Sequence, residues 1–121
     1  MTRDELRARI TVDPNVCFGK PCVRGHRIWV SLVLDWLAGG MTFEQIKADY
    51  DLADDDIRAC IAYAAEICRE RRVLDWLADG MTFEQIRADH GMTDEDIRNC
   101  IANAAGVCRK RRKGPLTEGR K

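Results

Sequence analysis

The chain has 121 residues, of which 45% are apolar, 33% are charged and 7% are aromatic, and its formal net charge is zero. This length fits one small domain or two very small ones. A net charge of zero excludes bulk charge as a sign of a nucleic-acid or membrane partner. No apolar run approaches the roughly 20 residues of a membrane span, and the charged opening MTRDELRARI does not resemble a secretion signal, so we expect a cytoplasmic protein.

The first 32 residues have the pattern of short strands. Apolar and polar residues alternate between Leu6 and Val12, and Asp13-Pro14-Asn15 ends the alternation, which predicts a strand. After a loop at residues 19–21, two extended runs at 22–24 and 27–30 flank Gly25-His26. We therefore predict that residues 1–32 form a small β-ribbon arm.

Residues 33–72 and 73–112 are two copies of one 40-residue unit, and 28 of the 40 positions are identical. A repeat of this length marks a supersecondary unit. The charge differs between the parts, because the arm carries +3, the first copy −4, the second copy −1 and the tail at 113–121 carries +2. The tail contains two Gly and one Pro, and we expect it to be disordered.

Each copy reads as three helices. Ser31 can cap a first helix over residues 32–38, which Gly39-Gly40 ends. Thr42 and Gln45 predict a capping box for the second helix, and the second copy repeats this box. The third helix opens with three acidic residues in each copy, which favour a helix N-terminus. Thr93 caps that helix in the second copy, whereas Ala53 stands there in the first and should let it fray.

The two copies follow each other without a linker. No Gly or Pro occurs between Met41 and Asp79, so the third helix of the first copy can continue into the first helix of the second. We therefore predict a helix over residues 54–78, about 37 Å long at a rise of 1.5 Å per residue. The apolar phase slips at residues 69–72, which is where a bend would fall. The predicted fold class is mainly α, with tandem three-helix units behind a small N-terminal β-ribbon.

The second and third helices of each copy have a helix-turn-helix pattern, which points to DNA binding. In that motif the first turn of the last helix faces the bases, yet here that turn carries three carboxylates, which the anionic duplex repels. Candidates for phosphate contact therefore lie on the ribbon and at the end of the second copy. They are Arg7, Arg9, Lys20, Arg24, Arg27, Arg109, Lys110, Arg111, Arg112 and Lys113. For the last five, offsetting the helix dipole is an equally good interpretation.

The sequence offers no evident catalytic or metal set. Cys17, Cys22 and His26 match no zinc spacing and lack a fourth ligand. No nucleophile, base and orienting group can be assembled, so we expect neither an enzyme nor a metal or other cofactor. Four cysteines occupy repeat-related positions inside predicted helices and are interpreted as core thiols: Cys60, Cys68, Cys100 and Cys108.

Residues 10–65 carry a resemblance to a known family. The segments DPN, GKP, RG, RI, GMT and DI stand in the order and spacing of the bacterial domain of unknown function 433. His26 and Trp29 depart from that pattern, where Thr and Pro are usual, and the second copy repeats only the helical half. The resemblance implies a small β-ribbon before a homeodomain-like helical unit. It also implies a role as a VapB-type antitoxin, paired with a PIN-like nuclease toxin.

The resemblance and the repeat lead to a functional expectation. We expect an antitoxin that neutralises a PIN-like toxin and assembles as a homo-oligomer such as a dimer, with repression of its own promoter DNA as an additional role. A second copy without its own ribbon should leave an apolar surface near Trp76, so Trp29, Trp76 and Leu77 are the candidate partner contacts. The alternatives are a stand-alone helix-turn-helix regulator of transcription and a structural protein-interaction module.

Overall fold

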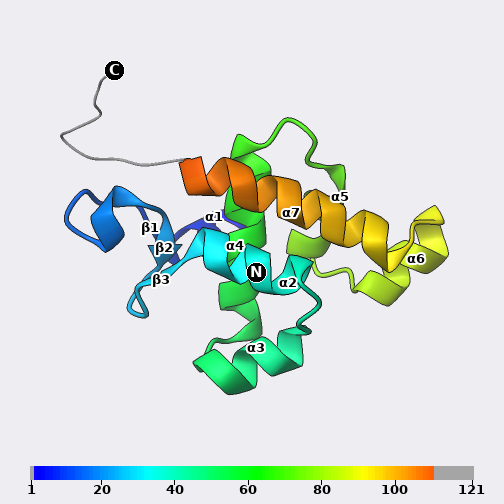
Figure 1. Cartoon of the computed structure of the whole chain (residues 1–121), viewed down its shortest axis with the longest axis horizontal. Coiled ribbons are helices and arrows are strands. Elements are labelled where there is room, and N and C mark those ends of the chain that lie inside the picture. The colour runs from blue at the N-terminus through cyan, green and yellow to red at the C-terminus, as the bar shows by residue number, and fades with distance from the viewer. Residues whose placement is uncertain (1, 111–121) are drawn as a thin grey trace.

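The computed structural model describes residues 2–110. In this range the chain is mainly helical, with a small antiparallel sheet near its N-terminus, as predicted (Figure 1). The elements in order are α1 (Arg3–Arg7), β1 (Ile10–Thr11), the 3₁₀ turn η1 (Cys17–Gly19), β2 (Cys22–Val23), β3 (Ile28–Trp29), α2 (Val30–Ala38), α3 (Phe43–Tyr50), α4 (Asp54–Ile67), α5 (Arg72–Ala78), α6 (Phe83–His90) and α7 (Asp94–Lys110). No helix in the described range has both the length and the apolar character that crossing a bilayer requires.

The N-terminal arm differs from the predicted strand. The chain opens with the short helix α1, because Thr2 accepts a hydrogen bond from the Glu5 amide and the Glu5 carboxylate accepts one from the Thr2 amide. This capping box outweighs the alternating pattern, and the strand shrinks to β1. β1 pairs with β2 and β2 with β3, with Ile10 opposite Val23 and Val23 opposite Ile28. The arm is therefore a three-stranded sheet preceded by one helical turn.

The predicted caps are confirmed at three of the helices in the two copies. Thr42 and Thr82 cap α3 and α6 with complete capping boxes. Thr93 accepts from the amide of Asp96 at 3.1 Å. The prediction for Ser31 is wrong, because α2 begins two residues earlier and Ser31 lies buried in its first turn. Trp29 occupies the N-cap with φ −65°, which is the value a proline imposes, so the absence of Pro leaves the chain path unchanged.

The long helix predicted across the junction does not form. α4 ends at Ile67 and α5 begins at Arg72, with Cys68 in extended conformation between them. The break lies where the apolar phase slips. Because the chain turns there, α5 folds back along α4, and the two helices share one of the largest contacts in the molecule. A continuous helix would have carried the apolar stripe of α5 away from α4, so burial of that stripe overrides the local helical preference.

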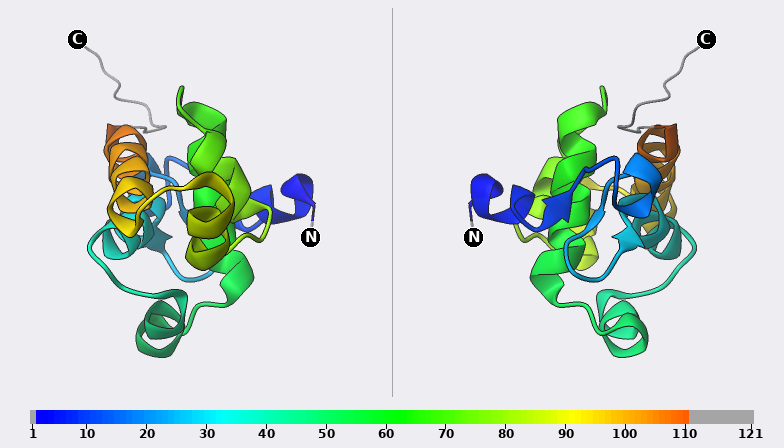
Figure 2. Two further views of the ribbon diagram at one scale, coloured as in Figure 1. Left: turned by 90° about the vertical axis from the view of Figure 1, so that its right-hand side faces the viewer. Right: turned by 90° about the vertical axis from the view of Figure 1, so that its left-hand side faces the viewer.

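Helices pack mainly between the copies. α2 of the first copy lies along α7 of the second, and α5 of the second lies along α4 of the first (Figures 1 and 2). These are equivalent pairs, so the exchange is reciprocal, as in an isologous dimer interface. α4 and α7 also contact each other. One contiguous core results, to which both copies contribute equivalent side chains such as Leu34 and Leu74, or Ile61 and Ile101.

The arm breaks this internal symmetry. α1 and β1 lie on α4, and the side chains of Ala59 and Tyr63 are buried beneath them. The equivalent face of α7 carries no second arm, and Asn99 and Asn103 there are exposed. Two of the twelve differences between the copies are thus apolar-to-polar changes that match the difference in burial. The arm also ties to α5, since Arg3 donates to Asp75 at 3.1 Å and to Asp79 at 3.0 Å.

Candidate functional sites

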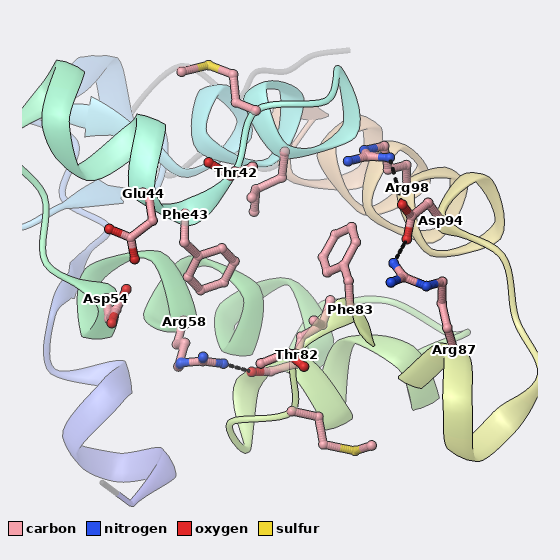
Figure 3. A pocket seen from close by; sticks show the side chains of 14 residues that line it. Thr42, Phe43, Glu44, Asp54, Arg58, Thr82, Phe83, Arg87, Asp94 and Arg98 are labelled. Atoms are coloured by element: carbon pink, nitrogen blue, oxygen red, sulfur yellow. Dashed lines mark hydrogen bonds and ion pairs between the residues drawn. The ribbon is translucent and has the colours of Figure 1, made fainter. Parts of the chain in front are cut away.

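A groove lies between the two copies, where α3, α4, α6 and α7 approach one another (Figure 3). Its volume is about 510 Å³. We call it the central groove, and it is lined by Leu37, Met41, Thr42, Phe43, Glu44, Asp54, Arg58, Leu77, Met81, Thr82, Phe83, Arg87, Asp94 and Arg98. Apart from Glu44 and Arg87, these residues form equivalent pairs from the two copies. Reciprocal packing therefore presents the same chemistry from both sides of one cavity.

Two aromatic rings and two guanidinium groups define the interior of the central groove. Phe43 and Phe83 point toward each other across it (Figure 3). The guanidinium of Arg58 lies 5.0 Å from the centre of the Phe43 ring, and that of Arg98 lies 5.4 Å from the Phe83 ring. Both distances fall within the range of a cation–π contact. Both rings are only half-buried.

The two arginines of the groove differ in their partners. Arg58 donates from Nη1 to the backbone oxygen of Leu77 at 2.5 Å and so satisfies a carbonyl group at the end of α5. Arg98 has a distant contact with Asp94, 3.8 Å from Nη1 to the carboxylate. Its Nε is buried and has no hydrogen-bond partner among the described residues. An unsatisfied buried donor of this kind costs on the order of 1–3 kcal/mol, so Arg98 is the polar group in the groove that lacks a full set of partners.

The carboxylates of the groove are paired with cations. Lys47 contacts Asp54 and Glu44, each at 3.2 Å, which raises the pKa of Lys47 through hydrogen bonds to these two carboxylates. Arg87 forms an ion pair with Asp94. These contacts lie near the start of α4 and α7 and neutralise much of the acidic first turn. The pairing leaves the groove without a strong negative field, and a net preference for cations is not expected there.

Four of the seven described basic residues that were predicted to contact phosphate instead contact other parts of the fold. Arg9 donates to Asp56 at 2.8 Å, and Arg7 pairs with Glu66 at 3.6 Å while lying over Tyr63. These contacts cover the acidic start and one face of α4. The helix that a helix-turn-helix motif would use for reading bases is therefore occupied by the arm in the first copy.

The ribbon also contacts the end of α7. Lys20 donates to the backbone oxygen of Arg109 at 2.6 Å and lies over the ring of Trp29. Arg109 in turn donates to Asp35 at 2.5 Å. Lys110 is exposed, and Arg111, Arg112 and Lys113 lie outside the described residues. Lys20 and Arg109 thus connect the arm, α2 and α7, which gives them a structural role.

Two predicted arginines and one aromatic residue are free to meet a partner on the ribbon. Arg24 and Arg27 are exposed around the β2–β3 turn and form no ion pair within residues 2–110. Phe18 is 76% exposed. It lies among three successive left-handed residues, with φ of 54° at Cys17, 59° at Phe18 and 82° at Gly19. The sequence pattern did not point to Phe18, and the adjoining glycine was the available signal for an unusual turn.

The structure places the three predicted partner contacts in different environments. The prediction that Leu77 contacts a partner at the surface is wrong, because its side chain is fully buried in the shared core. Trp76 is half-buried and stacks on His90, with ring centres 3.7 Å apart, as Trp36 stacks on Tyr50 at 3.8 Å. Trp29 is half-buried beneath Lys20. The surface left bare by the missing second ribbon lies on α7 and is polar.

The cysteines are mostly part of the packing. Cys60 and Cys108 are buried, and Cys68 and Cys100 are half-buried. Burial raises the pKa of the Cys60 thiol well above its usual value. Burial and the neighbouring Cys17 thiol raise the pKa of Cys22 to about 12. Within the described part of the chain, no three His, Cys, Asp or Glu side chains are placed to hold a metal ion together.

The geometry defines a class, a small helical protein in which two copies of one unit exchange helices behind a single β-ribbon arm. The family model described as "Protein of unknown function (DUF433)" matches the chain twice, over residues 10–64 and 69–104. The chain therefore belongs to this family, and the second match corresponds to the copy without the arm. No curated protein and no solved structure matches the sequence.

Proposed function

We propose that this protein is the antitoxin-like member of a toxin–antitoxin pair, which binds a PIN-like nuclease and neutralises it through the ribbon. The observation that carries the proposal is the exposure of Phe18, 76%, at the tip of a constrained turn. Large aromatic side chains are over-represented among the residues that anchor protein interfaces. The nuclease as partner comes from the family resemblance, and the exposed aromatic residue supports a protein partner in general.

The ribbon supplies the rigidity that such an anchor needs. Left-handed backbone at a non-glycine residue costs on the order of 1–3 kcal/mol and persists only where neighbouring contacts hold it. Here the Gly19 amide donates to the oxygen of Val16, and the Lys20 amide donates to that of Cys17. Lys20 then anchors the turn to α7. These contacts constrain the backbone at Phe18, which lowers the entropy lost on binding.

Charge around Phe18 suits an acidic partner. Arg24 and Arg27 are exposed on the same arm, without ion pairs in the described chain. A nuclease that holds metal ions with carboxylates presents a negative surface at its active site. Contact there would both attract the partner and cover its catalytic groups, which is how binding would become inhibition.

The test uses the full chain and the product of the adjacent gene. We expect a complex by gel filtration, inhibition of the nuclease, and a loss of affinity of about 30-fold or more for Phe18→Ala, the size expected for an interface anchor. Leu32→Ala, which removes an exposed side chain from α2, should bind normally. If the neighbouring product neither binds nor is inhibited, the antitoxin proposal is wrong. If Phe18→Ala binds like the parent protein, the assignment of the ribbon as the nuclease-binding surface is wrong.

A second candidate function is autonomous DNA binding. The exposed Arg24 and Arg27 favour DNA contact through the β-ribbon over contact through the helix-turn-helix segment. Fluorescence anisotropy with promoter DNA across a salt series tests this function. Phosphate contact predicts a linear fall of log affinity with log salt concentration. Changing both Arg24 and Arg27 to Gln should reduce the magnitude of this slope by roughly two. Binding that is unaffected by both salt and these changes would rule this mode out.

A further inference from the structure

We propose that the central groove binds a small aromatic molecule that carries one negative charge, such as an aromatic carboxylate. This site lies apart from the ribbon and does not depend on the toxin partner. Its volume of about 510 Å³ matches the cavities that hold small organic ligands, which span roughly 300–1,000 Å³. The groove is mostly apolar, with a small number of converging polar groups, which is the usual character of such a site.

The aromatic part of the proposed ligand is recognised by Phe43 and Phe83. Each ring projects from the start of its helix toward the other, and both are half-buried (Figure 3). A planar ligand placed between them would bury both rings and gain aromatic contact on each face. The guanidinium groups of Arg58 and Arg98 each lie over one of these rings.

The negative charge is recognised by Arg98. Its counterpart Arg58 already donates to the backbone of Leu77, whereas the Nε of Arg98 lacks a partner in the described chain. The nearest carboxylate, Asp94, is engaged by Arg87 and is 3.8 Å from Arg98. Since Nε is shielded from water, the side chain must turn to present its edge to a carboxylate. A bidentate ion pair then satisfies a donor that the free protein leaves unsatisfied.

The difference between the two arginines favours a single anchoring point for the negative charge of the ligand. If both guanidinium groups were unpartnered, the paired lining of the groove would favour a two-fold symmetric dianion. Arg58 uses Nη1 on the end of α5, and the unsatisfied buried nitrogen among the described residues belongs to Arg98, so we place the anion on the α7 side of the groove. The ligand is thus expected to lie with its ring between the two phenylalanines and its charged end toward α7.

The experiment titrates the full chain with 2-naphthoate and with the neutral analogue 2-naphthalenemethanol, followed by amide NMR spectra and calorimetry. We expect saturable binding of naphthoate, with the largest shifts at the starts of α3 and α6, and binding of the neutral analogue at least tenfold weaker. Arg98→Gln should weaken naphthoate roughly tenfold to a hundredfold, as expected for loss of a charge-assisted hydrogen bond. Arg69→Gln, which changes an exposed arginine between α4 and α5, is the matched control and should bind like the parent chain.

Phe83→Leu keeps an apolar side chain in the groove and removes only the ring. It should weaken both compounds, and it provides an independent variant if Arg98→Gln fails to fold by circular dichroism. Absence of saturable binding at millimolar naphthoate would overturn the proposal. Equal affinity for the charged and neutral compounds, or unchanged binding by both variants, would overturn it as well, because either result would place the ligand elsewhere.

Discussion

Replacing Ala53 by Thr should stabilise the protein, because the second copy shows which cap the first copy lacks. In α7, the hydroxyl of Thr93 accepts from the Asp96 amide at 3.1 Å, and the Asp96 carboxylate accepts from the Thr93 amide. In α4, only the second half of this box exists, from the Ala53 amide to Asp56 at 3.0 Å. Ala53 is exposed and has φ −89° and ψ 161°, a conformation that a β-branched residue accepts readily.

The expected gain is about 1 kcal/mol in the free energy of unfolding, the usual worth of a Thr cap over Ala. For a chain of this size that corresponds to a rise of roughly 4 °C in Tm. The reciprocal change, Thr93→Ala, should lose about the same amount. Urea unfolding followed by circular dichroism measures both variants and the double exchange, which should return close to the parent stability because the sites act on separate helices.

The outcome that would refute this reasoning is a destabilised Thr93→Ala together with an unchanged Ala53→Thr. That result would mean that Arg9, by holding Asp56 from the arm, already fixes the start of α4. The two helix starts would then be stabilised by different means, one by its own cap and the other by tertiary contact.

Further predictions concern the core, the junction, the arm and the thiols. Leu77→Ala should cost about 2–5 kcal/mol in urea unfolding, as a buried leucine does, whereas a surface leucine would change stability little. Insertion of Gly-Ser after Glu70 should cost only about 0.5 kcal/mol in the same assay, because it lengthens a loop; a loss of several kcal/mol would indicate a continuous helix there. Arg9→Met should cost about 1–3 kcal/mol by leaving the buried carboxylate of Asp56 without its cation, and a neutral result would show that water replaces the arginine. Cys60, whose burial raises its thiol pKa, should stay protonated at pH 8 and react with iodoacetamide only in urea; mass spectrometry of the native protein would refute this by finding Cys60 modified.

Local signals in the sequence correctly predicted where α3, α6 and α7 begin. Thr42, Thr82 and Thr93 each satisfy amides within three residues, so their effect does not depend on the rest of the fold. The opening residues contained two local signals at once, a capping box and an alternating pattern. The box prevailed because it satisfies two amides at the helix start, while the alternation only sorts side chains between two faces.

The exchange of helices between copies could not be predicted in the same way. α4 and α7 present nearly the same apolar stripe, with Ile57 equivalent to Ile97 and Ile61 to Ile101. α2 could therefore pack against either helix with similar burial, and in the structure it contacts both but packs mainly on α7. The central groove was missed for the same reason, since Phe43 and Phe83 are neighbours only after that exchange. A usable signal was present in Asn99 and Asn103, whose polarity marks the face of α7 that no arm covers.

Joining the two copies in one chain changes how the core responds to dilution. A core assembled from two separate chains weakens as protein concentration falls, because each folding event must then find a second molecule. Here α2 meets α7, and α5 meets α4, within one molecule, so the encounter occurs at an effective concentration set by the connecting segments. The stability of this core is therefore expected to be the same at nanomolar and micromolar protein concentration. It does not depend on how much of the chain a cell produces.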